Sequence, residues 1–201
     1  FERATKISGS GFYFLKGNLA MLDLALQRFA LDTIIAKGYT PVIPPYMINR
    51  KSYEEVTDLA DFEKVMYKIE DDDAYLIATA EHPMAAMYQD EIFEEKDLPL
   101  KMVGVSPCFR REIGAHGLDS RGLFRVHQFT KIEQFIYCMP EDSWKYHEEL
   151  LANAEEIFTK LELPYHVVNI CTGDIGTVAA KKYDIEAWMP RDNEYREVVS
   201  C

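Results

Sequence analysis

The sequence predicts an α+β domain with a mostly antiparallel sheet flanked by helices. Two observations support this class. Short apolar or alternating segments occur in neighbouring pairs, which is typical of hairpins. Two longer segments, at residues 17–38 and 141–163, have helical periodicity. With 201 residues, the chain is long enough for one sizeable core, and we expect a single domain over 1–201.

The first long helix is expected over "GNLAMLDLALQRFALDTIIAKG", with Asn18 as its N-cap and Gly38 just past its end. Leu19, Leu22 and Leu26 lie on one face, and further apolar residues occupy the other faces. Such a helix is buried on more than one side, and we expect one side to face a second subunit. The next segment, "TPVIPPYM", contains three prolines, which predict an edge or interfacial extended segment rather than a central strand.

Strands and helices follow in turn. "KVMYKIE" and "AYLIATA" flank three aspartates and predict a hairpin, and "HPMAAMYQDEIF" predicts a short helix. "LKMVGVSPCF" and "LFRVHQFTKIEQFIYC" predict two strands joined by a glycine-containing loop. "EDSWKYHEELLANAEEIFTKLEL" predicts an amphipathic helix, with one apolar stripe formed by Trp144, Leu151, Ala154, Phe158 and Leu161. We expect further strands at "YHVVNI", "DIEAWM" and "YREVVSC", and a short helix at "TVAAKKY".

Composition limits the classes of function. The net charge of −12 argues against broad non-specific binding of nucleic acid, although a local basic site remains compatible with it. The four cysteines form no C-x-x-C pair, so we expect free thiols in a reducing cytosol. The five histidines show no metal-ligand spacing, and structural hydrogen bonding is expected for His82 and His127. No apolar run approaches the length that spans a membrane.

Charged and aromatic side chains share a face of the two strands around residues 100–138. Arg125, Phe129 and Glu133 alternate on one face of the second strand, and Arg110 and Glu112 share a face of the first. Arginine binds phosphate, an aromatic ring stacks a base, and a carboxylate accepts from an amine. The face therefore suits a ligand with a phosphate, an adenine-like base and an ammonium group. A solvated face with internal ion pairs explains the same spacing equally well.

The motifs in this region resemble those of class II aminoacyl-tRNA synthetases, and most closely the seryl-tRNA synthetase family. "FRRE" followed by "GLFRVHQFTKIEQF" is similar to the second motif of that class. "SGSGFYFLKGNLAMLDLAL" and "GYTPVIPPYM" resemble its dimer-forming first motif, and "LIATAEHP" resembles its T-x-E segment. "KKYDIEAWMP" and "YREVVSC" resemble the segment that leads into the third motif.

The resemblance implies a cytoplasmic, homodimeric serine–tRNA ligase that uses ATP and Mg²⁺. It would make seryl-adenylate from L-serine and transfer the seryl group to tRNA(Ser). Arg110 would hold the α-phosphate as the catalytic residue, and Glu112 would accept from the adenine amino group. Arg125 would contact the phosphates beyond, and Phe129 would stack on the adenine.

The resemblance also implies a serine pocket and a metal site. The pocket would be formed by side chains with hydrogen-bonding groups, namely Thr79, Glu81, Arg110 and Glu133. Glu197 and Ser200 would bind the Mg²⁺ that bridges the ATP phosphates, which suits the preference of magnesium for oxygen ligands. The third motif and an N-terminal tRNA-binding arm do not occur in "FERATKISGSG" through "YREVVSC", so we expect a catalytic-core fragment.

Two other functions fit the same resemblance. The first is a non-catalytic dimeric paralogue that acts as an RNA-binding or regulatory module, although every matching position present here is filled. The second is a ligase that charges a carrier protein. The resemblance implies a cysteine-ligated zinc for that class, and no cysteine falls in the T-x-E segment.

Overall fold

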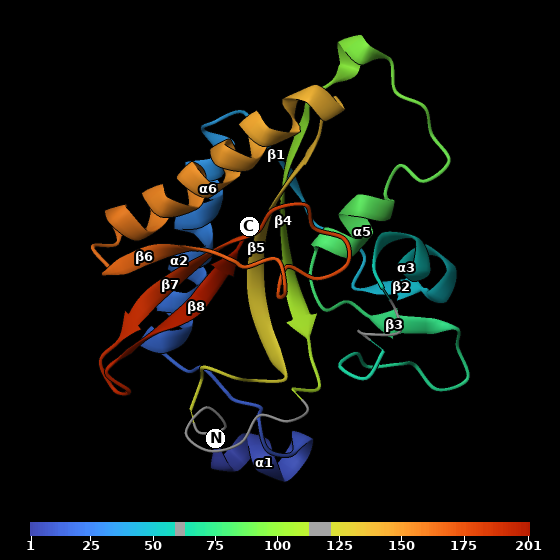
Figure 1. Ribbon diagram of the computed structural model, residues 1–201. Coiled ribbons are helices and arrows are strands. Elements are labelled where there is room, and N and C mark those ends of the chain that lie inside the picture. Colours follow the sequence, from blue (N-terminus) through green and yellow to red (C-terminus); the bar gives the residue numbers. More distant parts are fainter. Residues whose placement is uncertain (59–62, 113–121) are drawn as a thin grey trace. The chain divides into compact units, whose positions relative to one another are not determined.

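The computed structural model of the chain describes residues 1–58, 63–112 and 122–201 (Figure 1). These residues form two compact units, which we describe separately. The first unit comprises residues 1–92 and 101–135, and the second comprises residues 93–100 and 136–201. The single catalytic core over residues 1–201 stays a prediction. None of the described helices is long and apolar enough to cross a membrane.

The first unit is built on a three-stranded sheet in the order β1–β4–β5. The sheet consists of β1 (Thr40–Val42), β4 (Leu100–Phe109) and β5 (Gln128–Tyr137), and the outer ends of β4 and β5 reach into the second unit. β1 pairs in parallel with β4, with Pro41 opposite Val103. β4 and β5 run in opposite directions (Figure 1). The proline-rich segment therefore supplies an edge strand, as its sequence predicts.

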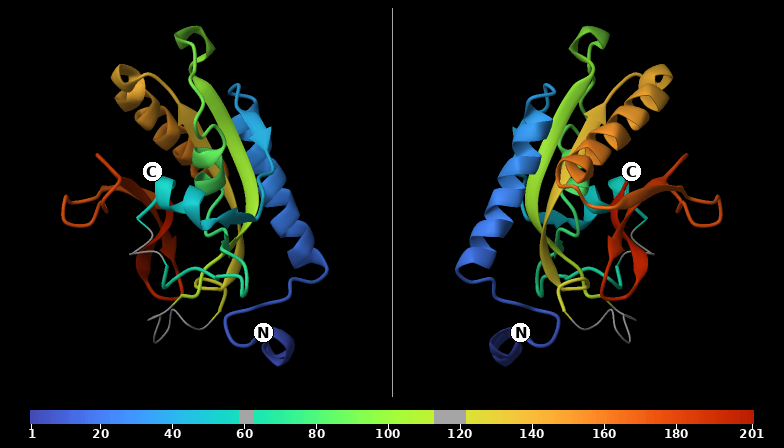
Figure 2. Two further views of the ribbon diagram at one scale, coloured as in Figure 1. Left: turned by 90° about the vertical axis from the view of Figure 1, so that its right-hand side faces the viewer. Right: turned by 90° about the vertical axis from the view of Figure 1, so that its left-hand side faces the viewer.

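Helices cover both faces of this sheet, namely α2 (Asn18–Ile35), α3 (Arg50–Val56) and α5 (Glu81–Ala86). A short helix, α1 (Glu2–Ser8), precedes them. Figure 2 shows α2 along one face of the sheet, and α3 and α5 on the other side. The predicted N-cap is wrong by one residue, because Gly17 caps α2 with a positive φ of 59° and Asn18 is already helical.

Helix α2 is less buried within the chain than its sequence predicts. Only Thr33 and Ile34 are buried along its length. Its N-terminal two-thirds exposes large apolar side chains, namely Leu19, Met21, Leu22, Leu24 and Leu26. An exposed apolar patch of this kind is typical of a surface that contacts another protein.

The hairpin predicted around the three aspartates is only partly present. Its second arm is β3 (Ala74–Leu76), but the regular partner of β3 is β2 (Met47–Asn49), which runs antiparallel to it. The first arm contributes one bridge, between Lys68 and Tyr75. Ile48 of β2 and Met66 of the first arm both join the buried cluster that contains Tyr75, so apolar side chains from both neighbours pack against β3.

The sequence reasoning missed α3, although its start signal is present. The Asn49 side chain accepts a hydrogen bond from the Ser52 amide at 2.8 Å, which caps the helix. The helix is short and follows β2 without a connecting turn, so no long periodic segment marks it.

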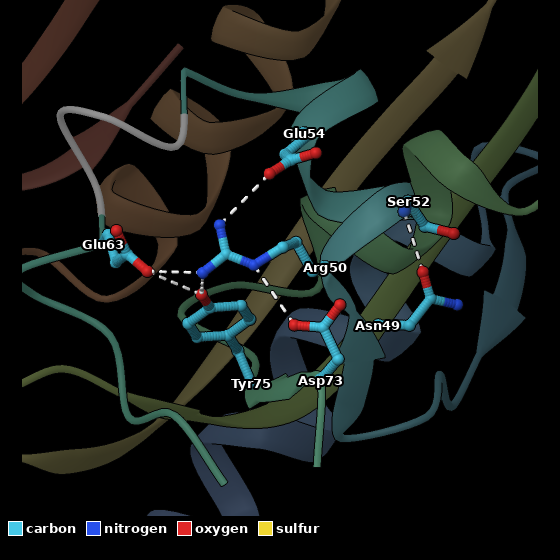
Figure 3. A network of polar contacts seen from close by, with 7 residues as sticks. All are labelled: Asn49, Arg50, Ser52, Glu54, Glu63, Asp73 and Tyr75. Carbon is cyan, nitrogen blue, oxygen red and sulfur yellow. Dashed lines mark hydrogen bonds and ion pairs between the residues drawn. The ribbon is translucent and has the colours of Figure 1, made fainter.

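Arg50, the first residue of α3, joins this helix to β3 through a polar network (Figure 3). Its guanidinium lies 3.2 Å from Asp73, 3.2 Å from Glu54 and 2.6 Å from Glu63. It also donates to the hydroxyl of the fully buried Tyr75, which itself donates to Glu63 at 2.8 Å. None of the residues of this network belongs to the predicted site.

The second unit packs a helix on a three-stranded sheet in the order β6–β7–β8. The strands are β6 (Tyr165–Asn169), β7 (Tyr183–Met189) and β8 (Glu194–Ser200), all antiparallel. The helix is α6 (Ser143–Lys160), and short 3₁₀ turns occur at η1 (Glu95–Asp97) and η3 (Pro140–Asp142). Leu151 and Ala154 of α6 form the core with Ile185.

Two expectations for the second unit are wrong. Trp144 lies on the predicted apolar stripe but is exposed, and the buried residue near the start of α6 is Tyr146. The helix predicted at "TVAAKKY" is absent, and residues 177–182 form bends and irregular structure. Val178 in this segment is exposed, so no burial of an apolar face stabilises a helix.

Candidate functional site

The predicted site residues of the first unit lie at the adjacent ends of β4 and β5, partly outside the strands. β4 ends at Phe109, so Arg110 and Glu112 follow it, and β5 begins at Gln128, so Arg125 precedes it. The strand alternation that placed these three residues on one face is therefore wrong beyond the strand ends. Glu112 has a positive φ of 45°, which no regular strand contains.

Backbone hydrogen bonds nevertheless hold these segments beside each other. The Phe109 amide donates to the Ile77 carbonyl at 2.9 Å, and the Arg110 amide donates to the His127 carbonyl at 3.0 Å. The Arg111 amide donates to the Val65 carbonyl at 2.8 Å. Three different parts of the first unit thus fix the chain around Arg110.

The first pair of predicted residues forms an ion pair. Arg125 donates from Nη1 to Oε2 of Glu112 at 3.1 Å. The Glu112 side chain is 15% exposed and that of Arg125 is 50% exposed. The internal ion pair that one reading of the sequence expects is therefore present, and the ATP-binding role of Arg125 and Glu112 stays a prediction.

The second pair joins the other arginine to the aromatic residue. The Arg110 guanidinium carbon lies 5.2 Å from the centre of the Phe129 ring, which is a cation–π distance. Its Nε donates to the Ala78 carbonyl at 3.3 Å. Arg110 thus packs against the Phe129 ring, and the Ala78 carbonyl holds its guanidinium group.

Thr79 and Glu133 come together across 54 residues of sequence and form a polar cluster. Thr79 Oγ1 donates to Glu133 Oε2 at 2.9 Å, and the Glu81 amide donates to Thr79 Oγ1 at 3.2 Å. The Thr79 residue is buried, and the Glu133 side chain is 13% exposed. The structure therefore brings together three of the four residues that the resemblance assigns to serine.

Lys131 also belongs to this cluster, although the sequence analysis did not select it. Its Nζ lies 2.5 Å from Glu133 Oε2 and donates to Thr79 Oγ1 at 3.0 Å. Lys131 lies on the same strand face as Phe129 and Glu133, and this alternation was the available signal. An ammonium group thus already occupies the acceptors of Thr79 and Glu133.

The environment of Glu81 disfavours its charged form. Burial of the carboxyl group raises its pKa, and the Glu133 carboxylate raises the pKa further. Lys131 and Arg110 act in the opposite direction. The residue as a whole keeps solvent exposure, whereas its carboxyl group is surrounded by protein atoms. Such a carboxylate gains from a cationic ligand that replaces lost solvation.

His127 links the start of β5 to the N-terminal segment. Its Nδ1 lies 2.6 Å from the Tyr67 hydroxyl, its amide donates to the Gly11 carbonyl at 2.9 Å, and its ring stacks on Phe12. A Cβ on Gly11 would lie 2.2 Å from the His127 ring, so this position requires glycine. The structural role expected for His127 is confirmed, and His82 likewise hydrogen-bonds Tyr53.

Glu197 and Ser200, the predicted metal ligands, lie on β8 of the second unit. Their spacing of three would place them on opposite faces of a regular strand. A register shift between Ile185 and Glu186 of β7 changes this, because Ser200 pairs with Asp184 and Glu197 pairs with Glu186. The bulge puts Glu197 and Ser200 on the same face, and both residues are exposed.

A carboxylate and a hydroxyl on one exposed face fit Mg²⁺, which prefers oxygen ligands and retains waters. Among residues 1–58, 63–112 and 122–201, no group of three or more histidine, cysteine, aspartate or glutamate side chains could hold a metal. A magnesium ion here would therefore take most of its ligands from the ATP phosphates and water.

Comparison with known proteins identifies the family. The model of the tRNA synthetase class II core domain (G, H, P, S and T) matches residues 65–201. The chain belongs to this family. The matched range contains every site residue described above, and the synthetase fold that the motifs imply is confirmed.

The similar proteins are named as serine–tRNA ligases or seryl-tRNA synthetases. A serine–tRNA ligase of Methanocorpusculum labreanum is 93% identical over all of this synthetase core, which covers 47% of that relative. The crystal structure of a Pyrococcus horikoshii seryl-tRNA synthetase complexed with ATP matches with a TM-score of 0.96 and 63% identity, over 100% of this chain and 45% of that one. A Naegleria fowleri cytoplasmic serine–tRNA ligase in complex with AMP matches with a TM-score of 0.93 and 45% identity, over 100% of this chain and 48% of that one. The chain thus spans about half the length of the relatives it matches.

Proposed function

We propose that the protein is a serine–tRNA ligase whose catalytic core includes residues 1–201. It activates L-serine with ATP to seryl-adenylate and then transfers the seryl group to tRNA(Ser). The observation that carries this proposal is the polar cluster of Thr79 and Glu133, together with the contact between Arg110 and Phe129. The names of the relatives, at up to 93% identity, support the same activity.

The ATP site uses the residues at the ends of β4 and β5. Phe129 stacks on the adenine, and Glu112 accepts a hydrogen bond from the adenine amino group. Arg110 binds the α-phosphate, and Arg125 binds the phosphates beyond it. The ion pair between Arg125 and Glu112 supports these roles, because it holds both side chains at the site before ATP arrives.

The serine site uses Thr79, Glu81 and Glu133, with Arg110 at its border. Lys131 supports this assignment, because its ammonium group shows that Thr79 and Glu133 can both contact an ammonium group at once. A free amino acid presents the same group. Serine has little apolar surface, so buried acceptors must recognise its ammonium and hydroxyl groups.

The first reaction needs no side-chain nucleophile. The serine carboxylate attacks the α-phosphorus, the bond from the α-phosphorus to the bridging oxygen breaks, and pyrophosphate leaves with that electron pair. Negative charge builds on the α-phosphate oxygens in the transition state, and Arg110 stabilises it from a fixed position. Glu197 and Ser200 hold Mg²⁺, which supplies charge neutralisation of the phosphates when bound.

The enzyme works as a homodimer in the cytoplasm. The exposed leucines of α2, which include Leu19, Leu22 and Leu26, support a subunit interface. The four free cysteines support a reducing compartment.

The test is serine-dependent exchange of pyrophosphate into ATP by the protein as encoded. We expect exchange with L-serine and Mg²⁺, and none with L-threonine or L-alanine. Charging of tRNA(Ser) measures the second step. A non-catalytic paralogue would show no exchange with any amino acid, and a carrier-protein ligase would show exchange without tRNA charging.

A further inference from the structure

Tyr53 of α3 and His82 of α5 form a buried polar pair next to the candidate serine pocket. The Tyr53 hydroxyl and His82 Nδ1 lie 2.6 Å apart, and their ring centres lie 4.7 Å apart. Tyr53 is fully buried, and His82 is 5% exposed. His82 directly follows Glu81, so the pair is attached to the pocket through the chain itself.

Tyr53 also packs with the backbone segment that leads into the pocket. Tyr53 and Ala78 belong to the same buried cluster, together with Tyr75 and Ile77. The Ala78 carbonyl accepts from Arg110 Nε at 3.3 Å. Tyr53 therefore lies in the cluster that anchors the segment leading to Thr79 and Glu81.

Both members of the pair are neutral at physiological pH. Burial, and then the charges of Lys131 and Arg110, lower the pKa of His82 to about 4. Burial raises the pKa of Tyr53. The hydrogen bond between them therefore joins two uncharged groups.

Packing alone does not require these polar groups. A buried hydroxyl or imidazole destabilises the fold when its hydrogen bond is missing, whereas apolar side chains of similar volume carry no such penalty. The benefit of a polar pair is a fixed geometry, and here the bond fixes the start of α5, which carries Glu81 beside Thr79.

We propose that Tyr53 and His82 are positioning residues for adenylate formation, which hold the start of α5 and, through it, Glu81 and its contact with Thr79. The role rests on the proposed function, because it concerns the step that makes seryl-adenylate. Neither residue is assigned to contact ATP or serine. Their effect passes through the start of α5.

The kinetic test compares Tyr53→Phe and His82→Leu with the wild type in serine-dependent pyrophosphate exchange. The loss of one positioning hydrogen bond should lower kcat/KM for serine by about tenfold, while KM for ATP changes by less than about twofold. His82→Gln keeps a group that can accept from Tyr53 and should restore most of the activity. A role in folding alone would lower the active fraction and leave both KM values unchanged.

Amide hydrogen exchange tests the positioning itself and does not depend on catalysis. In Tyr53→Phe, the amides of residues 78–81 should exchange faster while those of β4 stay protected. Tyr75→Phe is a matched control, because it removes another fully buried hydroxyl that bonds Glu63 and Arg50 outside the site (Figure 3). It should reduce stability but leave the exchange at residues 78–81 and both KM values unchanged.

The outcomes separate the two proposals. Unchanged protection at residues 78–81 in Tyr53→Phe would overturn the positioning role, whatever the enzyme activates. Faster amide exchange with normal kinetics would also overturn it, because the held geometry would not matter to the reaction. Absence of serine-dependent pyrophosphate exchange in the wild type would overturn the proposed function, and the amide exchange would still decide whether the pair holds this backbone.

Discussion

Arg125 donates to Glu112 at 3.1 Å, although the two residues flank the connection between β4 and β5 and lie 13 positions apart. The two side chains thereby set each other's position at the proposed ATP site. Each group retains capacity for a ligand, since a guanidinium has five N–H donors and a carboxylate can accept several hydrogen bonds. ATP would then add contacts to an existing pair instead of assembling the site from mobile charges.

Glu112→Gln tests this pair. The glutamine keeps the size of the side chain but loses the charge that holds Arg125 and attracts the adenine amino group. We expect KM for ATP to rise by about tenfold, and the free energy of unfolding to change by less than about 1 kcal/mol because Arg125 is half exposed. Exposed Glu141 provides the control Glu141→Gln, and equal KM values for the two variants would remove Glu112 from the ATP site.

Arg110→Ala tests the stabilisation of the developing charge on the phosphate. We expect serine-dependent pyrophosphate exchange to fall by about a hundredfold or more. The fold should survive, because the side chain stacks on Phe129 and contacts the Ala78 carbonyl instead of filling the core. Circular dichroism checks the fold, and Arg191→Ala, at an exposed turn, is the control. Near-normal exchange in Arg110→Ala would exclude this residue from the mechanism.

Glu133→Ala tests the serine pocket. Removal of the carboxylate that binds Thr79 and Lys131 should raise KM for serine by at least about tenfold, while KM for ATP stays within about twofold. Glu133→Gln retains a hydrogen-bond acceptor without the charge. Its KM for serine should therefore lie between those of the wild type and Glu133→Ala. A loss of ATP affinity with an unchanged KM for serine would contradict the assignment.

Much of the fold follows from patterns that are local in the sequence. The long helices α2 and α6 have helical periodicity, and the prolines at 41, 44 and 45 mark an edge strand. Helix α3 was missed because its seven residues contain no extended periodic pattern, and the Asn49 cap alone is a weak signal. The helix expected at residues 177–183 failed because nothing in the second unit buries Val178.

The site was predictable in its residue types but not in its contacts. The approach of Thr79 to Glu133 joins a loop to a strand across 54 residues, and no sequence period encodes such a contact. Arg110 follows the end of β4, and Arg125 precedes the start of β5. Their positions therefore depend on the bond from the Arg110 amide to the His127 carbonyl and on the Arg125–Glu112 ion pair. The bulge that aligns Glu197 with Ser200 is likewise a feature of pairing between strands.

Glu81→Gln should stabilise the unliganded protein at neutral pH. Burial and the Glu133 carboxylate raise the folded pKa of Glu81 above 4.5, so the folded state binds more protons than the unfolded state between these two values. Glu81 therefore stabilises the fold below pH 4.5, and this contribution is lost as the pH rises through the folded pKa. Thermal unfolding should show a higher midpoint for Glu81→Gln than for the wild type at pH 7.5, and a smaller difference at pH 4. The variant should also lose serine activation, and a lower midpoint at pH 7.5 would contradict the unfavourable ionisation.

His82 should give the protein a second pH dependence, with the opposite sign. Its folded pKa is about 4 against 6.5 for an ordinary histidine, because burial, with the charges of Lys131 and Arg110, disfavours the imidazolium. The unfolded state therefore binds more protons between these values, and stability is fully present above pH 6.5 and lost as the pH falls toward 4. At about 1.4 kcal/mol per pKa unit, the loss is about 3 kcal/mol.

The difference in unfolding free energy between the wild type and His82→Gln isolates this effect, because all other titrating groups are common to the two proteins. Glutamine does not titrate, so the unfolding free energy of His82→Gln should fall less steeply than that of the wild type between pH 6.5 and pH 4. Urea unfolding at half-unit steps of pH measures both curves. If the His82–Tyr53 bond requires a neutral imidazole, the two curves converge as the pH falls. Parallel curves over this range would show that His82 titrates normally, and that the bond to Tyr53 does not depend on a neutral ring.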